Sequence, residues 1–524
     1  LHYGIRYTIY LTGQPGSAFS RVIRLITPPL QLAGVTDGPQ PRLRLPPCRG
    51  NAASPANRTM KTVSRWLFAG ALLALFSVTV PSPASAAVPL GQTGMKPFDD
   101  WAPDKTGTQP VTTKLQQAVD WCRANDVTLY IAPGTYLVDG TITIKGADGG
   151  SNDDGHSYIH GDAYDRPVIK LQNGTFTGTP SPQNAAPVFS LIHEAGKNSS
   201  WIYFSVLSNL DFDLGNNPGA CALAYAAAQD SQLTNIRITG SAFTAGIVGF
   251  PGRNTTNVNL EVIGGRYGLV MRESVGINLT GVKCTNQSVA AVLVENYRGS
   301  TIVGLETSGP GPAIVCSGTE YEAGQLYLED ARIEITNSGN AAINMGNRNL
   351  VLRNVYVKGT NQVVTGTQFG LTVSAGTNWT HVKTYASASS PTNSRTAFNY
   401  FNGTKYINNE EEDFAYVATA PADLRTRHLP DEVFAFNHPE ATNALNAAGS
   451  TTRAKIQAAL DGPSRVVYVP AGYHGIDGSI TVPLGKVLIG DPGKRTFLNP
   501  TYTPTAQTFV VQTAAGTGSA VIQD

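Results

Sequence analysis

The stretch that decides the fold repeats one three-residue step, which reads Gly246-Ile247-Val248, Gly268-Leu269-Val270, Ala291-Val292-Leu293 and Ala313-Ile314-Val315. In each case a small residue precedes two apolar residues. The step also occurs at Ala222-Leu223-Ala224 and, with other third or first residues, at Ala342-Ile343-Asn344 and Phe369-Gly370-Leu371. The central positions 223, 247, 269, 292, 314 and 343 are separated by 24, 22, 23, 22 and 29 residues. Such self-similarity at a nearly fixed period indicates a repeat architecture.

A second series of short apolar-polar steps lies between the first ones. Its members are Asn209-Leu210-Asp211, Asn235-Ile236-Arg237, Asn257-Val258-Asn259, Asn354-Val355-Tyr356 and His381-Val382-Lys383. Alternation of apolar and polar residues is the period of a strand. Two short strands per turn predict a solenoid, because one turn cannot bury its own apolar face and must stack on the next. A β-sandwich would not repeat one step at this spacing. We therefore expect an all-β, right-handed parallel β-helix.

The chain also contains two copies of a longer sequence repeat. Residues 114–120 read Lys-Leu-Gln-Gln-Ala-Val-Asp and residues 455–461 read Lys-Ile-Gln-Ala-Ala-Leu-Asp, and each copy continues to a Gly-Asp step, at Gly161-Asp162 and Gly490-Asp491. The apolar residues of the first copy recur at helical spacing, which predicts an amphipathic helix: Leu115, Ala118, Val119 and Cys122. Such a helix can cap the open end of a solenoid. Two caps predict two β-helices in tandem.

These features divide the chain into five parts. Residues 60–86 combine a basic start, the apolar run 66–80 and an Ala-x-Ala site at 84–86, which predicts a signal peptide and a secreted protein with no membrane segment after its removal. We expect residues 1–59 to be a non-native upstream extension; the alternative is a genuine N-terminal extension with an internal anchor. The first β-helix is expected at 88–400, a connector with the acidic run 410–413 at 401–447, and the start of an incomplete second β-helix at 448–524. The alternative for that last part is a short natural lobe.

Composition excludes several classes of function. The chain has 524 residues, 14% of them charged, and a formal net charge of +1, so it carries no electrostatic footprint for nucleic acid. Four cysteines follow the signal peptide, and none forms a Cys-x-x-Cys pair: Cys122, Cys221, Cys284 and Cys316. A zinc or redox site is therefore not expected, and the sequence predicts no cofactor. We favour buried cysteines over one or two disulfides, and we expect a monomer.

The phrase around 116–136 resembles the opening of the pectate-lyase-like β-helix superfamily, which includes rhamnogalacturonase- and epimerase-type domains. Two copies in one chain are most similar to glycoside hydrolase family 55, the tandem β-helix β-1,3-glucanases. This resemblance implies an active site in a cleft between two β-helices, with a glutamate of the second as the general acid. Here that residue would lie beyond Asp524. The resemblance also implies paired glutamines on the first β-helix that place the attacking water; Gln229 matches one of them, and Ala226 occupies the place of the other.

Carboxylates are the residues to search, because glycoside hydrolysis needs an acid and a base or nucleophile. Asp211 and Asp213 stand two apart on one predicted strand, so both face the same side. We expect their mutual repulsion to raise one pKa. Glu273 and Glu295 end strands on successive turns, next to Arg272. The competing interpretation for all of these is ordinary solvated surface pairing. Three tyrosines are candidates for stacking on sugar rings, or else for packing between turns: Tyr225, Tyr267 and Tyr297.

Three functions remain open. The leading hypothesis is a secreted glycoside hydrolase whose substrate is β-1,3-glucan or a related wall polysaccharide. The second is a polyuronate lyase or hydrolase, for which Asp211, Asp213 and Arg237 on adjacent turns form a minimal set. The third is a carbohydrate-binding or adhesive β-helix without catalysis, because one scaffold hosts many functions. Calcium dependence would favour the lyase, and binding without turnover would favour the third.

Overall fold

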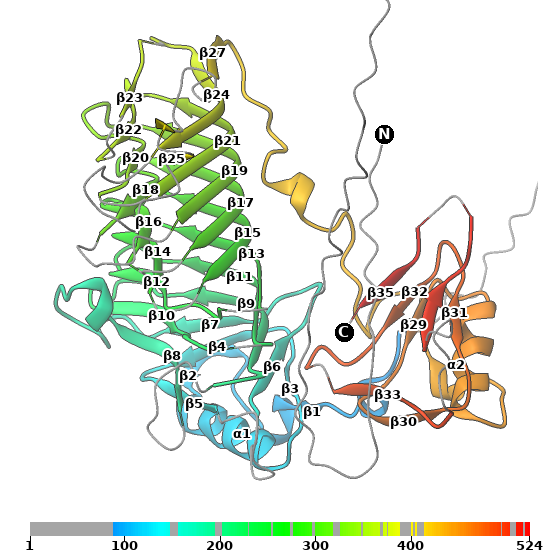
Figure 1. Cartoon of the computed structure of the whole chain (residues 1–524). Helices are drawn as coiled ribbons and strands as arrows, with labels where there is room; N and C mark the ends of the chain where they lie inside the picture. Colours follow the sequence, from blue (N-terminus) through cyan, green and yellow to red (C-terminus); the bar gives the residue numbers. More distant parts are fainter. Residues whose placement is uncertain are drawn as a thin grey trace, which may run out of the picture. The chain divides into compact units, whose positions relative to one another are not determined.

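Two parallel sheets stack turn upon turn in the computed structural model, and the larger one, sheet A, has 15 strands. The long strands in its centre follow one another in chain order (Figure 1). The bounds are β1 (Lys96–Pro97), β2 (Thr106–Pro110), β3 (Leu129–Ile131), β4 (Thr135–Val138), β6 (Tyr158–Gly161), β7 (Val168–Leu171), β9 (Val206–Asp213), β11 (Gln232–Thr239), β13 (Thr256–Ile263), β15 (Ile277–Thr285), β17 (Ser300–Gly309), β19 (Gln325–Ile335), β21 (Asn349–Lys358), β24 (Trp379–Ser387) and β27 (Asp413–Val417).

The second sheet, sheet B, has 10 strands and contains the small-apolar-apolar steps. Its strands are β5 (Ile142–Gly146), β8 (Ala186–His193), β10 (Ala220–Ala224), β12 (Ala245–Val248), β14 (Tyr267–Met271), β16 (Ala290–Val294), β18 (Ile314–Cys316), β20 (Ile343–Asn344), β22 (Gln362–Thr365) and β23 (Leu371–Thr372). The central residues of the step, such as Leu223, Ile247 and Leu269, are aligned by parallel pairing. The predicted fold, a right-handed parallel β-helix, is confirmed.

The structure describes residues 87–146, 156–193, 202–228, 230–252, 255–272, 276–295, 299–317, 325–346, 349–366, 370–374, 376–387, 400–401, 404–405, 413–493, 495–502, 510–516 and 519–523. The chain divides into two compact units, residues 1–78 and 79–524, and all described residues belong to the second. The predicted signal peptide and upstream extension lie outside the described residues. Within them, no helix is both long and apolar enough to span a membrane.

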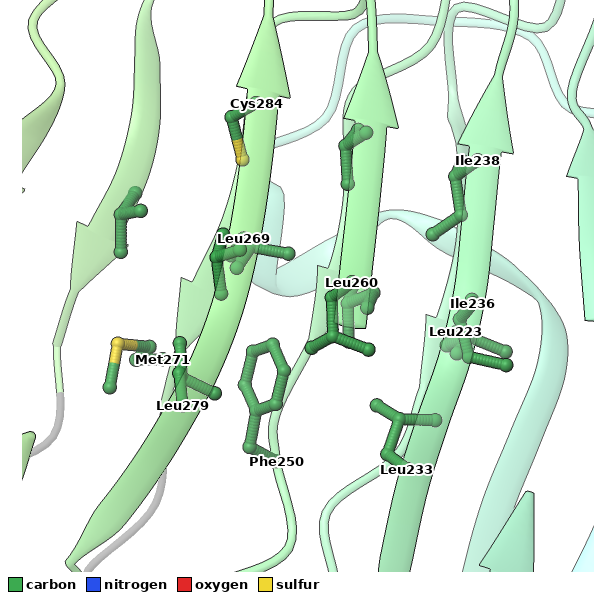
Figure 2. Packing of buried hydrophobic residues seen from close by; sticks show 14 of the residues in the cluster. Leu223, Leu233, Ile236, Ile238, Phe250, Leu260, Leu269, Met271, Leu279 and Cys284 are labelled. Carbon is green, nitrogen blue, oxygen red and sulfur yellow. The ribbon is translucent and has the colours of Figure 1, made fainter. Parts of the chain in front are cut away.

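One continuous core fills the space between the sheets (Figure 2). Side chains from sheet A, such as Ile236 and Leu260, meet side chains from sheet B, such as Leu223 and Leu269, and all four are fully buried. Burying a side chain of this size contributes about 1.5–3 kcal/mol. The four cysteines are buried, which confirms the apolar interpretation for them: Cys122, Cys221, Cys284 and Cys316.

A helix caps the beginning of each repeat copy. In α1 (Thr112–Ala124) the four residues of the predicted apolar face are buried, and in α2 (Thr452–Asp461) Ile456, Ala459 and Leu460 are. The Gln116 side chain pairs with the backbone of Thr143, accepting from its N at 2.8 Å and donating to its O at 2.9 Å. Gln457 does the same with Thr481, at 2.9 and 3.0 Å. Each glutamine thus extends the ladder of backbone hydrogen bonds by one rung onto the helix.

The second copy forms a smaller set of parallel strands. They are β28 (Ala441–Asn443), β29 (Val466–Tyr468), β30 (Gly472–Ile476), β31 (Ile480–Val482), β32 (Val487–Ile489), β33 (Thr496–Pro500), β34 (Val511–Thr513) and β35 (Val521–Gln523). Strands β28, β29, β32 and β35 form one sheet, whereas β30–β33 and β31–β34 are two-stranded. These pairings repeat β3–β6, β4–β7 and β5–β8 of the first copy.

The two copies contact each other through equivalent positions. Tyr130 of β3 and Tyr468 of β29 both pack on Phe436, with ring centroids 5.4 and 6.2 Å apart. The two Gly-Asp steps also cross over: Asp162 accepts from Asn437 Nδ2 at 2.6 Å, and Asp491 accepts from Thr128 Oγ1 at 3.0 Å. The two copies of the sequence repeat therefore contribute equivalent residues to one interface.

The far end of the first β-helix departs from the expected pattern. The steps at 381–383 and 369–371 suggested two more parallel turns, but β24 pairs antiparallel with β21 and β23 antiparallel with β22. Strand β27 then pairs antiparallel with β24. The chain reverses here instead of continuing the solenoid. A short hairpin, β25 (Tyr400–Phe401) and β26 (Thr404–Lys405), lies between β24 and β27 in sequence.

Residues 413–447 of the connector are described and contact the first β-helix, whereas residues 410–412 of its acidic run lie outside the described residues. Its 3-10 turn η6 (Thr426–His428) lies against β15 and β17. Arg425 donates to Asn259 Oδ1 at 2.5 Å and to Gly281 O at 3.0 Å. A Cβ at Gly281 would come within 2.3 Å of the Leu429 side chain. Other short 3-10 turns are η1 (Leu90–Gln92), η2 (Phe98–Trp101), η3 (Pro182–Asn184) and η7 (Ala444–Asn446).

Candidate functional site

Asp211 and Asp213 lie on the outer face of sheet A, at the end of β9. Their neighbours Leu210 and Phe212 are buried, and both aspartates are half-buried. The two carboxylates therefore point to the same side of the strand, as their spacing predicts. Their surroundings differ, however, so they are not an equivalent pair.

Asp211 lies between two arginines. Arg166 Nε is 2.9 Å from its Oδ1 and Arg237 Nη1 is 4.0 Å from its Oδ2. Oδ1 accepts no hydrogen bond from the described residues, so the contact with Arg166 is an ion pair without hydrogen-bond geometry. Arg166 is held in place by donation of Nη1 to Asn235 O at 3.2 Å. The site therefore has one half-buried carboxyl between two fixed positive charges.

Burial raises the pKa of the Asp211 carboxyl above its usual value. The charges of Arg166 and Arg237 oppose this effect, and that of Glu261 adds to it. The expected repulsion between the paired aspartates is not among the causes of the shift. Asp213 instead accepts a hydrogen bond from Gly215 N at 3.0 Å, which stabilises the turn after β9. The pKa is therefore raised by desolvation and not by mutual repulsion of the two aspartates.

Asp211 also begins a ladder of alternating charges along sheet A. Parallel register places its members on successive strands: Asp211, Arg237, Glu261, Lys283, Glu306 and Arg332. Neighbouring members form ion pairs with N–O distances of 3.5 to 4.0 Å. Pairs of this kind at a surface contribute about 0–1 kcal/mol each. The ladder agrees with the surface-pairing interpretation for most of these residues, and Asp211 differs because of its burial and its second arginine.

Glu295 lies elsewhere, beyond the end of β16 in sheet B. Its carboxylate accepts a hydrogen bond from Gln183 Nε2 of η3, and its backbone N donates to Met271 O at 2.8 Å. Arg272, which follows Met271, is exposed on the neighbouring turn. Glu273 lies outside the described residues. The structure therefore brings Arg272 and Glu295 onto adjacent turns but sets Glu295 on a different sheet from Asp211.

The aromatic candidates separate into three cases. Tyr225 is buried in the core and its hydroxyl has no hydrogen-bond partner among the described residues, so it packs between turns and offers no ring face to a sugar. Tyr267 is half-buried beside an outer apolar cluster of sheet B, and Cζ of Arg266 lies 5.8 Å from its ring centroid. Tyr297 and Gln229 lie outside the described residues.

Sequence reasoning missed Arg166, Gln183 and Glu261. Glu261 was missed because the sequence steps place Val258 opposite Ile236, whereas the register of β11 and β13 pairs Ile236 with Leu260 and Arg237 with Glu261. Arg166 and Gln183 come from irregular segments, whose contacts no period predicts. Among the described residues, no group of three or more His, Cys, Asp or Glu side chains is arranged to hold a metal ion.

The segment that contains these residues is similar to a known family. Residues 99–315 match the family described as rhamnogalacturonase A/epimerase, pectate lyase-like. Over this segment the chain is similar to pectate-lyase-like β-helices. It contains Asp211, Arg166, Arg237 and Glu295, so both candidate regions belong to the pectate-lyase-like part of the chain. No curated protein matches the chain significantly.

Several solved structures are similar to parts of the chain. The surface adhesin PfbA of Streptococcus pneumoniae is 9% identical over 56% of this chain and 98% of its own, with a TM-score of 0.26. The tailspike protein of Acinetobacter baumannii phage AM24 is 12% identical over 52% and 53%, with a TM-score of 0.30. A putative glycosyl hydrolase from Parabacteroides merdae is 12% identical over 53% and 98%, with a TM-score of 0.21. At these values the likenesses carry no argument about function.

Proposed function

We propose that the protein is a secreted glycoside hydrolase that degrades a cell-wall polysaccharide, with Asp211 as the proton donor. The observation that carries the proposal is the raised pKa of a half-buried carboxyl on the outer face of a pectate-lyase-like β-helix. A raised pKa favours the protonated form of the carboxyl, which is the form that a general acid requires. Secretion rests on the signal-peptide pattern at 60–86.

Asp213 is the proposed partner of Asp211. Two residues along a strand span about 6.6 Å, which is close to the separation of the two carboxyl groups in inverting glycosidases. In this arrangement Asp211 protonates the leaving oxygen and Asp213 deprotonates the attacking water. Arg166 and Arg237 fix the Asp211 side chain and bind hydroxyl or acidic groups of the sugar. We propose β-1,3-glucan or a related glycan as the substrate, following the resemblance to tandem β-helix glucanases.

A second candidate function is cleavage of polyuronate. Two guanidinium groups within 4.0 Å of Asp211 favour it, because guanidinium binds the carboxylate of a uronate residue with matched geometry. Hydrolysis and lyase cleavage are then distinguished by their products, since only elimination creates a double bond that absorbs ultraviolet light.

The test is a reducing-sugar assay of the full chain on laminarin and on polygalacturonate, with and without calcium. Asp211→Asn should lower turnover about 10²- to 10⁴-fold, the usual contribution of a general acid. Activity of the wild type should fall as the pH rises through the raised pKa of Asp211, because the acid form is then lost. The matched control is Glu306→Gln, which removes another carboxylate of the same ladder between Lys283 and Arg332.

The outcomes separate the alternatives. Turnover of laminarin that is lost in Asp211→Asn and kept in Glu306→Gln supports the hydrolase. Turnover of polygalacturonate alone, with ultraviolet-absorbing products, supports the lyase. If Asp211→Asn cleaves laminarin as fast as the wild type, Asp211 is not the acid and its assignment as the proton donor is overturned. Binding without turnover of either substrate overturns the enzyme and favours an adhesive module.

A further inference from the structure

Tyr473 is far more exposed than the other large apolar side chains on the described surface. It lies in β30, and 81% of its surface is accessible, whereas the next, Ile522, has 51%. Its ring stacks on that of Phe497 in β33, with centroids 4.6 Å apart and planes at 10°. The two residues are paired in register on adjacent strands (Figure 1). One ring face is therefore covered by Phe497 and the other is open.

In the first repeat copy, the position equivalent to Tyr473 is covered by a neighbouring strand. Gly134-Thr135 of β4 corresponds in sequence to Gly472-Tyr473 of β30, and β4 lies between β7 and β2. Strand β2 approaches so closely that a Cβ at Gly107 would come within 2.6 Å of the Thr135 side chain. A small threonine fits under this strand, and a tyrosine ring would not.

The second copy has no counterpart of β2 among the described residues. Between β28 and α2 the chain has only residues 444–451, which form η7 and a short turn. Strand β30 pairs with β33 alone among the described strands, so its other edge presents backbone N–H and C=O groups. An unpaired strand edge beside a large exposed aromatic ring promotes aggregation unless a ligand or another chain segment binds there.

The chemistry beside the ring fits a sugar better than a protein strand. Tyr473 and Gly475 share the exposed side of β30, and Gly475 is paired in register with the exposed Asn499. This gives a flat aromatic face, an edge of backbone hydrogen-bonding groups and an amide, which match the C–H face and the hydroxyls of a pyranose. A partner strand would need pockets for its alternate side chains. The glycines of β30 at positions 472 and 475 have no side chains that could line such pockets.

We propose that Tyr473 is the stacking platform of a carbohydrate-binding subsite at the open edge of β30. One pyranose ring of a polysaccharide occupies the place that β2 occupies in the first copy, stacked on the free face of Tyr473. Its hydroxyls bind the backbone edge of β30 and the side chain of Asn499. The subsite is separate from Asp211 and holds the polymer rather than cleaving it. This inference rests on the proposed function, since it requires a polysaccharide ligand.

The test measures binding of the full chain to laminarin and to polygalacturonate by affinity electrophoresis. Tyr473→Ala should weaken binding to the recognised polymer about tenfold, the size of one lost aromatic contact, and Tyr473→Phe should keep it within about twofold. Ile522→Ala is the matched control, because it removes an exposed apolar side chain from β35 in the same lobe. Thermal unfolding of each variant shows whether the fold is kept, which the exposure of Tyr473 predicts.

The possible results separate the subsite from the enzyme. Weaker binding in Tyr473→Ala alone, with turnover at saturating substrate unchanged, supports the subsite. Wild-type binding that Tyr473→Ala leaves intact overturns the subsite while the proposed function stands. A wild type that neither binds nor cleaves either polymer overturns both. Self-association of the wild type that Tyr473→Ala abolishes, seen by light scattering without any change in glycan binding, overturns the sugar in favour of a protein contact.

Discussion

The two copies of the repeat share their caps and differ at one edge. In both, a glutamine on the capping helix pairs with the backbone of a threonine in the third strand after that helix, and the four distances agree within 0.2 Å, from 2.8 to 3.0 Å. In the first copy β4 pairs with a strand at each edge, whereas among the described strands β30 pairs with β33 alone. The residues that close the end of the solenoid are therefore the same in both copies, whereas the strand pairing at the outer edge differs between them.

The buried face of each cap should show the largest effect. Leu115→Ala and Ile456→Ala each remove a fully buried side chain, which typically costs about 2–5 kcal/mol. We expect the greater loss at Leu115, because it lies in the larger core cluster, where the surroundings collapse less easily. Urea unfolding followed by circular dichroism measures both. Gln117→Ala, an exposed change on α1, is the control and should stay within about 0.5 kcal/mol. Equal small losses in all three variants would contradict a packed cap.

The buried His160 should make the first copy sensitive to acid. Burial lowers the pKa of His160 to about 4, and the second copy has Ile489 at the equivalent place. The unfolded chain binds a proton below about pH 6.5 and the folded chain only below about 4, so stability is present above pH 6.5 and falls as the pH drops. The loss should approach about 3 kcal/mol at pH 4. Unfolding midpoints between pH 7 and 4 measure it, and His160→Gln should flatten the slope. An unchanged slope would mean that other groups control the acid sensitivity.

The cap glutamines should show the smallest effect and the closest agreement between the copies. Gln116→Ala and Gln457→Ala each leave a backbone N–H and C=O without a partner, at a cost of about 1–3 kcal/mol. Replacement by Glu keeps the acceptor but sets a carboxylate oxygen against the threonine carbonyl oxygen, so it should not rescue the lost stability. Hydrogen exchange at the Thr143 and Thr481 amides reports each site directly. Protection that is lost at one threonine and kept at the other would show that the two caps are not equivalent.

The repeated parts of the fold could be predicted from sequence, and the irregular parts could not. The step at 246–248 fixes both a strand and its place in the stack, because the same apolar positions recur at one period. His381-Val382-Lys383 resembles Asn235-Ile236-Arg237 of the second series of steps, yet β24 runs antiparallel. Strand direction depends on the path of the preceding loop, and a short apolar-polar step contains no information about it.

The candidate site was predicted only in part, for a similar reason. Asp211 and Asp213 were found because strand period places both on one face. The burial of Asp211 depends on Arg166, which reaches it from an irregular segment before β7. Tyr225 and Tyr473 are both tyrosines next to apolar strands, but the first is fully buried and the second is exposed. Tyr225 belongs to the core cluster between the sheets, whereas Tyr473 lies on the exposed side of β30, and sequence alone did not separate the two cases.

The interface between the two copies has a consequence for synthesis. Tyr468 donates to Thr93 O across 375 positions of sequence, and Thr128 donates to Asp491 across 363. A ribosome adds about 5–20 residues per second, so the first strand waits roughly 20 to 75 s for the residues that cover it. During that time Met95 and Tyr130 present an apolar surface that belongs to the finished interface. The earliest part of the described chain to be made is thus among the last to be completed, and any delay in translation before residue 491 prolongs its exposure to aggregation.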